Sequence, residues 1–155
     1  MKEINVFDQN IYEMNKIREK LLSKQIKLEP GGVSLTKKNQ NCTSKTSLAI
    51  IVPYRNREKH LKLFISNMHP FLTRQKINYG IYLVEPIGNL KFNRGILKNI
   101  GYVESLKDRS DWNCFMFHDV DFYPENFRNL YKCDDFFPKH FAVSVQQFGY
   151  NKFKM

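Results

Sequence analysis

Residues 48–52 have the sequence Leu-Ala-Ile-Ile-Val and are followed at once by Pro53. A short apolar run of this kind is typical of a strand that is buried on both faces, as in a parallel sheet covered by helices. Two similar apolar runs follow, at residues 79–84 and 114–117. The chain therefore has three candidate core strands.

Both segments between these runs carry apolar residues at helical spacing. In the first segment the residues of the expected apolar face are Leu61, Phe64, Ile65, Met68, Phe71 and Leu72, and in the second they are Ile96, Leu97, Ile100, Val103 and Leu106. The resulting order, β-α-β-α-β, predicts an α/β fold with a parallel sheet and right-handed crossovers. Ligands of such sheets bind beyond the carboxyl ends of the strands.

The first third of the chain has a different character. Residues 9–28 have weak helical periodicity that ends at Pro30, and residues 33–47 are rich in Thr, Ser, Asn and Lys. We therefore expect residues 1–47 to form a polar helical leader and linker, and residues 48–155 to form the folded domain. The sequence has no apolar run near the roughly 20 residues that span a bilayer, and no apolar signal core at its start, so it predicts neither anchor nor secretion signal.

The net charge and the distribution of basic residues indicate which classes of ligand the chain could bind. A hydrophobic fraction of 42% in 155 residues is that of a globular protein, and the formal net charge is +10. The excess of basic residues is concentrated in residues 51–100, but there is no block of consecutive Lys/Arg and no basic stripe with interleaved aromatics. Nucleic-acid binding is therefore disfavoured, and a compact anion such as a nucleoside diphosphate fits better.

The three cysteines, Cys42, Cys114 and Cys133, lack the CxxC or Cys/His spacing of a zinc site. Metal binding through thiolates is therefore not expected. An odd count is compatible with free thiols in a reducing compartment, or with one disulfide and one unpaired cysteine in an oxidising one.

Charged residues follow each of the three candidate strands. Arg55 and Arg57 follow the first strand, Arg94 follows the second, and Asp119 and Asp121 follow the third. Alternation along an extended backbone predicts that both carboxylates point to one side, where they could hold Mg²⁺ or Mn²⁺ together with a diphosphate. The same alternation sends His118 to the other side, which indicates packing.

Each of these motifs also has a purely structural interpretation. Asp-Val-Asp could be a solvated turn, and the two arginines after the first strand could solvate the start of a helix. Phe92 could face a base or act as a hydrophobic staple, and Asn93 could cap the following helix. Dinucleotide and ATP binding are disfavoured more firmly, because GxGxxG and GxxxxGK[ST] are both absent from the sequence.

In combination and in this order, several motifs resemble the beta-1,4-galactosyltransferase family. They are PYRNR at 53–57, YGIYLVE at 79–85, FNRG at 92–95, LKNIGYVES at 97–105, CFMFHDVD at 114–121 and PKHFAVSVQQFGY at 138–150. The resemblance implies a GT-A, Rossmann-like domain that requires Mn²⁺. It also implies inverting transfer of galactose from UDP-galactose to a beta-linked N-acetylglucosamine, glucose or xylose acceptor on a glycoprotein or glycolipid. Some members of the family instead use UDP-N-acetylgalactosamine, and the complete family form is a type II membrane protein of the Golgi lumen.

Site residues are implied by the resemblance position by position. The donor-binding set is Pro53, Tyr54 (where the family usually has Phe), Arg55, Asn56, Arg57, Phe92, Asn93, Arg94, Asp119, Val120 and Asp121, with Asp121 as the metal ligand. The family's disulfide falls on Cys114 and Cys133. Cys42 matches a cysteine whose usual partner lies upstream, where this sequence has none, and Glu85-Pro86 departs from the family's pattern.

The resemblance stops at Tyr150, before the family's Trp-Gly-Trp-Gly-Gly-Glu-Asp-Asp acceptor segment and its Met and His metal ligands. The sequence therefore predicts the donor-binding β-α-β-α-β half of a GT-A domain, truncated before the acceptor-binding half. No catalytic base has a candidate, and we expect no transfer by this chain alone. Three alternatives stay open: a fragment or partial gene model of an enzyme, a short product that binds UDP or a partner protein without turnover, and an unrelated basic scaffold.

Overall fold

A computed structural model describes residues 33–34, 44–88 and 91–142 of the chain. The helix expected over residues 9–28 lies outside the described residues, as do Cys42 and most of the expected linker. The described residues include all three candidate core strands and both intervening helices.

The described elements, in chain order, are β1 (Val33–Ser34), β2 (Ser47–Pro53), α2 (Glu58–Arg74), β3 (Asn78–Val84), α3 (Arg94–Asp108) and β4 (Cys114–Phe117). The four strands form a sheet in the order β1-β3-β2-β4, in which β2 runs parallel to both β3 and β4. The β-α-β-α-β order and the parallel sheet predicted from the sequence are confirmed.

Strand β1 was not predicted. It pairs antiparallel with β3 and falls in the segment that we expected to be a linker. A two-residue strand is too short to show the alternation by which strands are recognised in a sequence. The division of the chain at residue 47 stays a prediction.

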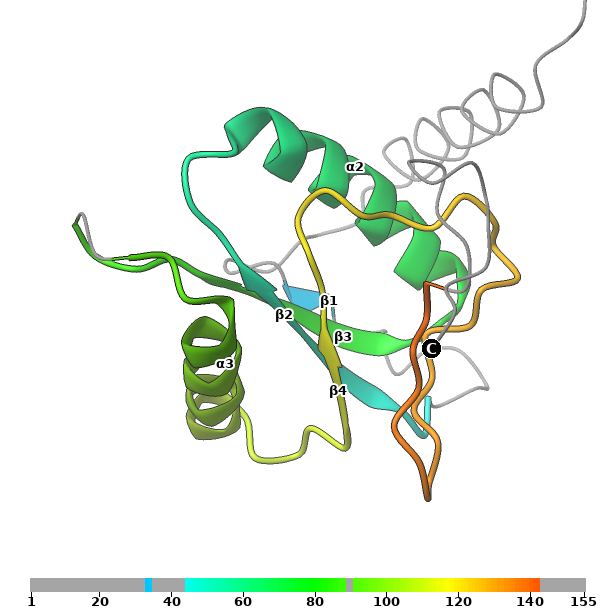
Figure 1. The fold of residues 1–155 in the computed structure, drawn as a ribbon. Coiled ribbons are helices and arrows are strands. Elements are labelled where there is room, and N and C mark those ends of the chain that lie inside the picture. The colour runs from blue at the N-terminus through cyan, green and yellow to red at the C-terminus, as the bar shows by residue number, and fades with distance from the viewer. Residues whose placement is uncertain (1–32, 35–43, 89–90, 143–155) are drawn as a thin grey trace, which may run out of the picture.

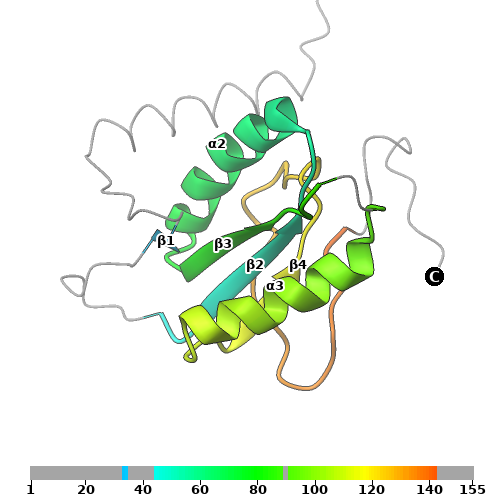
Figure 2. The ribbon, with the colours of Figure 1, turned by 90° about the vertical axis from the view of Figure 1, so that its left-hand side faces the viewer.

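The sheet lies between its two helices, with α2 on one face and α3 on the other (Figures 1 and 2). Residues 48–52 of β2 are fully buried, as expected for a strand covered on both faces. Leu48, Ile50 and Val52 belong to the core cluster that includes the apolar residues of α2. Phe64, Met68, Phe71 and Leu72 are buried in that cluster and Leu61 and Ile65 pack against it, which confirms the predicted apolar face of α2.

The predicted apolar face of α3 was only partly right: of its five residues, Leu97 is buried and Leu106 is half-buried. The residues that α3 buries are Leu97, Gly101 and Ser105. Of the residues expected to be buried, Ile96, Ile100 and Val103 are 46–55% exposed. The cause is close packing: a Cβ on Gly101 would lie 2.4 Å from Cγ2 of Ile51. The helix therefore meets the sheet through Leu97 and its small residues, and Ile96, Ile100 and Val103 lie outside the contact.

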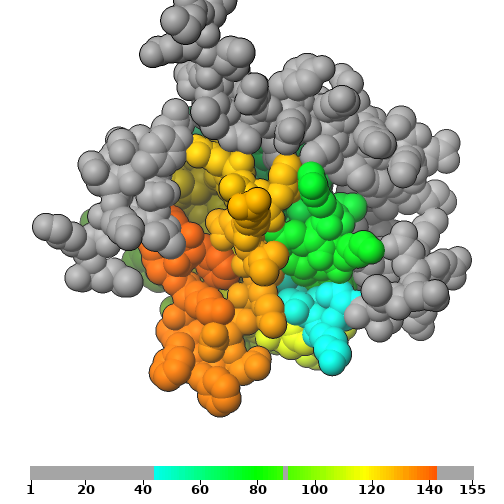
Figure 3. Space-filling view, turned by 90° about the vertical axis from the view of Figure 1, so that its right-hand side faces the viewer, coloured from blue at the N-terminus to red at the C-terminus, as the bar shows by residue number. Residues whose placement is uncertain are grey.

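The segment after β4 has no regular secondary structure within the described residues, but it is tied down at several points. Figure 3 shows this segment in gold and orange, beside green residues around the end of α2. Gln75 joins the two parts, because its Nε2 donates to the carbonyl of Asn129 at 2.9 Å and its Oε1 accepts from the backbone N–H of Tyr131 at 3.0 Å.

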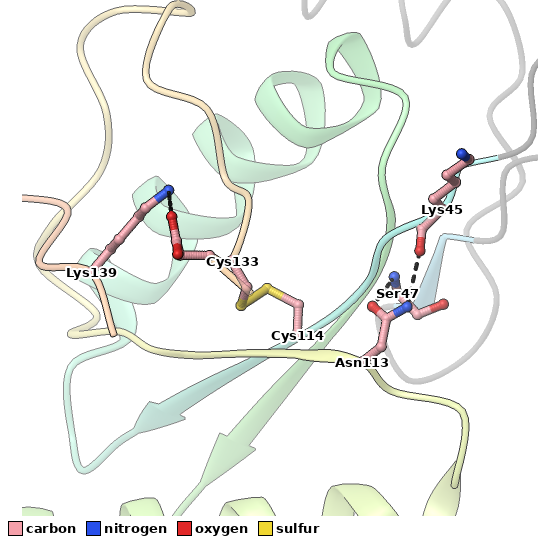
Figure 4. Close-up of a disulfide and its surroundings, with 7 residues drawn as sticks. Lys45, Ser47, Asn113, Cys114, Cys133 and Lys139 are labelled. Atoms are coloured by element: carbon pink, nitrogen blue, oxygen red, sulfur yellow. Dashed lines mark hydrogen bonds and ion pairs between the residues drawn. A yellow bond between two sulfur atoms is a disulfide. The ribbon is translucent and has the colours of Figure 1, made fainter. Parts of the chain in front are cut away.

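A disulfide between Cys114 and Cys133 fixes this segment to the last strand (Figure 4). The pairing implied by the family resemblance is thus confirmed. On the neighbouring residue, Asn113, the side chain accepts from the backbone N–H of Ser47 and donates to the carbonyl of Lys45, each at 2.9 Å. These bonds hold the starts of β2 and β4 together.

No helix in the described part of the chain is both long enough and apolar enough to cross a bilayer.

Candidate functional site

A cavity of about 280 Å³ lies where the loops after β2, β3 and β4 meet. Its lining consists of Pro53, Arg55, Arg57, Phe92, Arg94, Asp119, Val120 and Asp121. All eight are among the eleven donor-binding residues expected from the sequence. The carboxyl ends of the parallel strands thus bring together residues that are more than 60 positions apart in the chain.

The other three expected residues lie beside this cavity and do not line it. Tyr54 is buried, and its backbone N–H donates to the carbonyl of Val84 at 2.9 Å. Asn56 has a φ of 51°, a left-handed conformation that asparagine tolerates better than most residues. The side chain of Asn93 accepts from the backbone N–H of Ile96 at 3.1 Å, so this residue caps α3 as its structural interpretation predicted. These residues shape the loops that carry the lining side chains.

Two arginines of the cavity are placed by helix starts. Arg57 is the N-cap residue of α2, and Arg94 is the first residue of α3. The guanidinium of Arg55 lies 5.5 Å from the centroid of the Phe92 ring, a cation–π contact. Helix N-termini carry partial positive charge, so both helices add to the field of the arginines. The arrangement is suited to an anion.

Asp119, Val120 and Asp121 do not continue the extended strand, which corrects the backbone conformation expected from the sequence. The backbone N–H of Phe122 donates to the carbonyl of Asp119 at 3.2 Å, which closes a turn. Both carboxylates still line the same cavity, and each is paired with an arginine. The distance from Arg57 Nη1 to Asp121 Oδ2 is 2.7 Å, and that from Arg94 Nη1 to Asp119 Oδ2 is 3.2 Å.

His118 supports this turn from the core side, as predicted. Its ring packs against Phe64 with 5.1 Å between centroids, and Nδ1 lies 2.8 Å from the carbonyl oxygen of Asp119. Since a carbonyl only accepts, Nδ1 carries the proton, and Nε2 accepts from the hydroxyl of Tyr131 at 2.9 Å. Burial lowers the pKa of His118 and raises the pKa of Tyr131. A buried neutral imidazole therefore links Tyr131 to the backbone of Asp119.

This burial predicts a pH dependence of stability. Below a pH of about 6.5, His118 binds a proton in the unfolded chain but stays neutral in the folded chain, because burial lowers its pKa there. Protonation therefore favours the unfolded chain, and the free energy of unfolding is expected to fall between pH 7.5 and 5.5. The lowered pKa of His69, also caused by burial, contributes in the same direction. Urea unfolding at several pH values would measure the slope. His118→Gln should flatten it, whereas His60→Gln, which changes an exposed histidine, should not. Equal slopes for His118→Gln and the parent chain would contradict this assignment.

The carboxylates of the cavity suit a hard divalent cation, because Mg²⁺ and Mn²⁺ prefer oxygen ligands. The described residues contain no group of three or more His, Cys, Asp or Glu side chains placed to hold a metal ion. The donor set therefore fits a cation that shares its coordination sphere with phosphate oxygens and water, and it does not fit a cage made by protein ligands. Within this set Asp121 would supply the protein oxygen, with Asp119 beside it.

The role of Tyr131 was missed in the sequence. This residue lies in an irregular segment, ten positions beyond Asp121, and no local pattern connects it with the turn. A second cavity, of about 620 Å³, shares Asp119 with the first and was missed as well; its lining includes Phe115, Phe117, Phe122, Phe136, Phe137 and Phe141. The only signal for it in the sequence was the density of phenylalanine after β4.

Comparison with known sequences places the chain among glycosyltransferases. A family model that describes the N-terminal region of glycosyl transferase group 7 matches residues 2–134. Human beta-1,4-galactosyltransferase 4 is 50% identical over 111 residues, which are 72% of this chain and 32% of that protein. Beta-1,4-galactosyltransferase 3 of Cricetulus griseus is 44% identical over 131 residues, which are 84% of this chain and 32% of that protein. The chain thus spans about a third of the length of these relatives.

Solved structures show the same relationship in the fold. The catalytic domain of Drosophila beta-1,4-galactosyltransferase 7, in complex with xylobiose, aligns with a TM-score of 0.55 and 30% identity. The alignment covers 59% of this chain and 37% of that chain. A mutant of the same enzyme, in complex with manganese, UDP-Gal and xylobiose, aligns over the same shares with a TM-score of 0.53 and 32% identity.

Proposed function

Because the chain belongs to the beta-1,4-galactosyltransferase family, we propose that it provides the nucleotide-sugar-binding part of a galactosyltransferase. Its α/β fold is that of the Rossmann-like half of a GT-A catalytic domain. The observation that carries the proposal is the 280 Å³ cavity, which gathers three arginines, two aspartates and Phe92 at the carboxyl ends of the strands.

The proposed donor is UDP-galactose. Guanidinium groups hold phosphate oxygens in bidentate fashion, and Arg55, Arg57 and Arg94 line one cavity with Phe92, which could flank the uridine. The two helix starts add positive potential at the same place. UDP-N-acetylgalactosamine is the alternative donor within the family, and the residues of this cavity do not separate the two sugars.

Mn²⁺ is the proposed cofactor, with Asp121 as its protein ligand and Asp119 beside it. When bound, this cation would offset the negative charge that grows on the diphosphate as the sugar leaves. The arginines of the cavity act on the same charge: Arg55, Arg57 and Arg94 would bind the diphosphate oxygens and stabilise UDP as the leaving group. They would also orient the donor, whose anomeric carbon must face the acceptor.

For the whole protein we propose transfer with inversion to a beta-linked N-acetylglucosamine, glucose or xylose of a glycoprotein or glycolipid, in the Golgi lumen. An acceptor hydroxyl would attack from the face opposite UDP while a general base removes its proton. The disulfide between Cys114 and Cys133 supports an oxidising compartment, since such bonds persist there. The base is not assigned to any residue of this chain.

The second candidate function is UDP binding without turnover. It is supported by the lining of the 280 Å³ cavity, to which we assign donor contacts only and no acceptor contact. We expect the 155-residue polypeptide, assayed by itself, to bind UDP and to transfer no labelled galactose to N-acetylglucosamine. Mn²⁺-dependent transfer by the purified polypeptide would contradict this expectation and favour the enzyme.

Calorimetric titration with UDP tests the donor site directly. We expect millimolar affinity, a binding free energy of about −4 kcal/mol, and stronger binding when Mn²⁺ is present. Arg94→Ala should weaken UDP binding both with and without Mn²⁺, by about tenfold in the absence of Mn²⁺, because it removes a charge-assisted hydrogen bond to phosphate. Asp121→Asn should remove most of the Mn²⁺ effect without weakening metal-free UDP binding.

Lys107→Ala is the matched control, since it also removes one exposed positive charge from α3, but in the last helical turn and outside the lining of the cavity. Its UDP affinity should equal that of the parent chain. A folded chain that binds no UDP would overturn the donor-site proposal. An unchanged Mn²⁺ effect in Asp121→Asn would overturn the metal assignment alone.

A further inference from the structure

Asp121, the proposed cation ligand, and Asp119 beside it are both paired with arginines that would bind the diphosphate. Asp121 is paired with Arg57 at 2.7 Å, and Asp119 is paired with Arg94 at 3.2 Å. We propose that the two arginines exchange partners, from these carboxylates to the diphosphate, so that cation and nucleotide bind cooperatively. This inference rests on the proposed donor function and adds a role for Arg57 and Arg94 that is distinct from holding phosphate.

Both ion pairs are open to solvent, which makes the exchange feasible. The side chains of Arg57 and Asp121 are 52% and 42% exposed, and those of Arg94 and Asp119 are 61% and 26% exposed. Exposed pairs of this kind shift an equilibrium by only about two- to fivefold each. Ligands of even millimolar affinity can therefore displace them, and neither pair would lock the site shut.

The cooperativity follows from the number of ion pairs that must break when each ligand binds. A cation that binds alone must take Asp121 from Arg57, and it then faces an unpaired guanidinium at close range. A diphosphate that binds alone must take Arg57 from Asp121, and it then faces an unpaired carboxylate. When both bind, the pair is broken once and each member gains a new partner of opposite charge. The coupling is reciprocal, so the nucleotide must raise the affinity for the cation as much as the cation raises that for the nucleotide.

The balance of charge in the cavity favours the same outcome. Its lining carries three arginines and two aspartates, which leaves a net charge of +1, and both aspartates are paired with arginines. A cation alone would add to an excess of positive charge, and a diphosphate alone would meet two carboxylates. The site is therefore expected to respond to the metal–nucleotide pair more strongly than to either component.

A simpler account would assign all of the coupling to direct attraction between cation and phosphate. The two accounts differ for Arg57→Ala. If direct attraction is the whole cause, this substitution weakens UDP binding and leaves the Mn²⁺ effect on UDP unchanged. If partners are exchanged, Asp121 is already released in the variant. Mn²⁺ should then bind more tightly in the absence of nucleotide, and the cooperativity should shrink.

The experiment measures Mn²⁺ binding without nucleotide, from the electron paramagnetic resonance signal of free Mn²⁺, and UDP binding with and without Mn²⁺ by calorimetry. For Arg57→Ala we expect Mn²⁺ alone to bind about two- to fivefold more tightly, and the Mn²⁺ enhancement of UDP binding to fall by a similar factor. Arg57→Lys keeps the positive charge and should restore most of the coupling. Lys107→Ala should change neither quantity, and circular dichroism should show all variants folded.

The outcomes separate the two proposals. If the parent chain binds no UDP, the donor-site proposal fails. If UDP binds but Arg57→Ala leaves Mn²⁺ affinity unchanged or weaker, or keeps the full Mn²⁺ enhancement, partner exchange is overturned while the donor site stands. Arg94→Ala tests the pair between Arg94 and Asp119 in the same way. We expect tighter Mn²⁺ binding in the absence of nucleotide and a smaller Mn²⁺ enhancement of UDP binding.

Discussion

Gly101→Val is expected to lower the free energy of unfolding by about 3 kcal/mol, as an overpacked core position does. A Cβ at position 101 would lie 2.4 Å from Cγ2 of Ile51 and 2.7 Å from Cγ2 of Val84. These atoms belong to β2 and β3, so the backbone of α3 would have to move away from the sheet. Urea unfolding monitored by circular dichroism would measure the loss. Since Arg94 begins the same helix, UDP affinity should fall in parallel.

Alanine substitutions at two glycines of α3 provide a control, because they are expected to change the free energy of unfolding in opposite directions. Gly95→Ala should stabilise the chain by up to about 1 kcal/mol, because alanine has the higher helix propensity and its Cβ would meet only the Asn93 side chain, at 3.5 Å. Gly101→Ala gains the same propensity but meets the sheet, so a net loss is expected. Equal effects at both positions would show that α3 does not pack as closely as the structure indicates.

Gly101 also explains why the buried face of α2 was predicted correctly and that of α3 only in part. For α2, the bulky apolar residues are those that meet the sheet, so a search for apolar periodicity finds the buried face. For α3, the contact is made through Leu97, Gly101 and Ser105, two of which carry no apolar side chain to be counted. The periodicity of Ile96, Ile100 and Val103 is real, but it describes a face that is largely exposed.

The location of the site could be predicted from the sequence, but its internal pairing could not. Parallel strands bring their carboxyl ends to one edge, and this rule alone predicts that Arg57 and Asp121 lie at the same edge although they are 64 positions apart. The turn at Asp119 depends on the hydrogen bond from Phe122 and on His118, whose partner Tyr131 is distant in sequence. Which arginine pairs with which carboxylate is a matter of loop geometry that residue types do not encode.

The exposed side of α3 and the aromatic residues around the second cavity are both large apolar features outside the donor site. Phe136 and Phe137 are 85% and 75% exposed, and they line that cavity with Asp119. Contiguous exposed apolar surface on a folded domain commonly marks a contact surface. They lie in a chain that spans about a third of its relatives' length.

Removal of the disulfide, by Cys114→Ala with Cys133→Ala, is expected to lower the free energy of unfolding by about 3 kcal/mol, from the chain-entropy model for a loop of this length. The two cysteines are 19 positions apart, and the bridge is what ties the irregular segment after β4 to the sheet. Cys133 lies two positions after Tyr131, whose hydroxyl donates to His118. We therefore expect the loss to reach the Asp119 turn and to weaken UDP binding as well as stability.

Cys42→Ala is the control for this prediction, since it removes a thiol but not the bridge. It should leave both the unfolding midpoint and the UDP affinity unchanged, and peptide mapping without reduction should find Cys114 linked to Cys133 alone. Cleavage of the bridge by a reductant should reproduce the double substitution in the parent chain and have no further effect on the variant. A parent chain whose stability is the same in oxidising and reducing buffer would show that the hydrogen bonds of Gln75 and the ring contacts of Tyr131 hold this segment without the bridge.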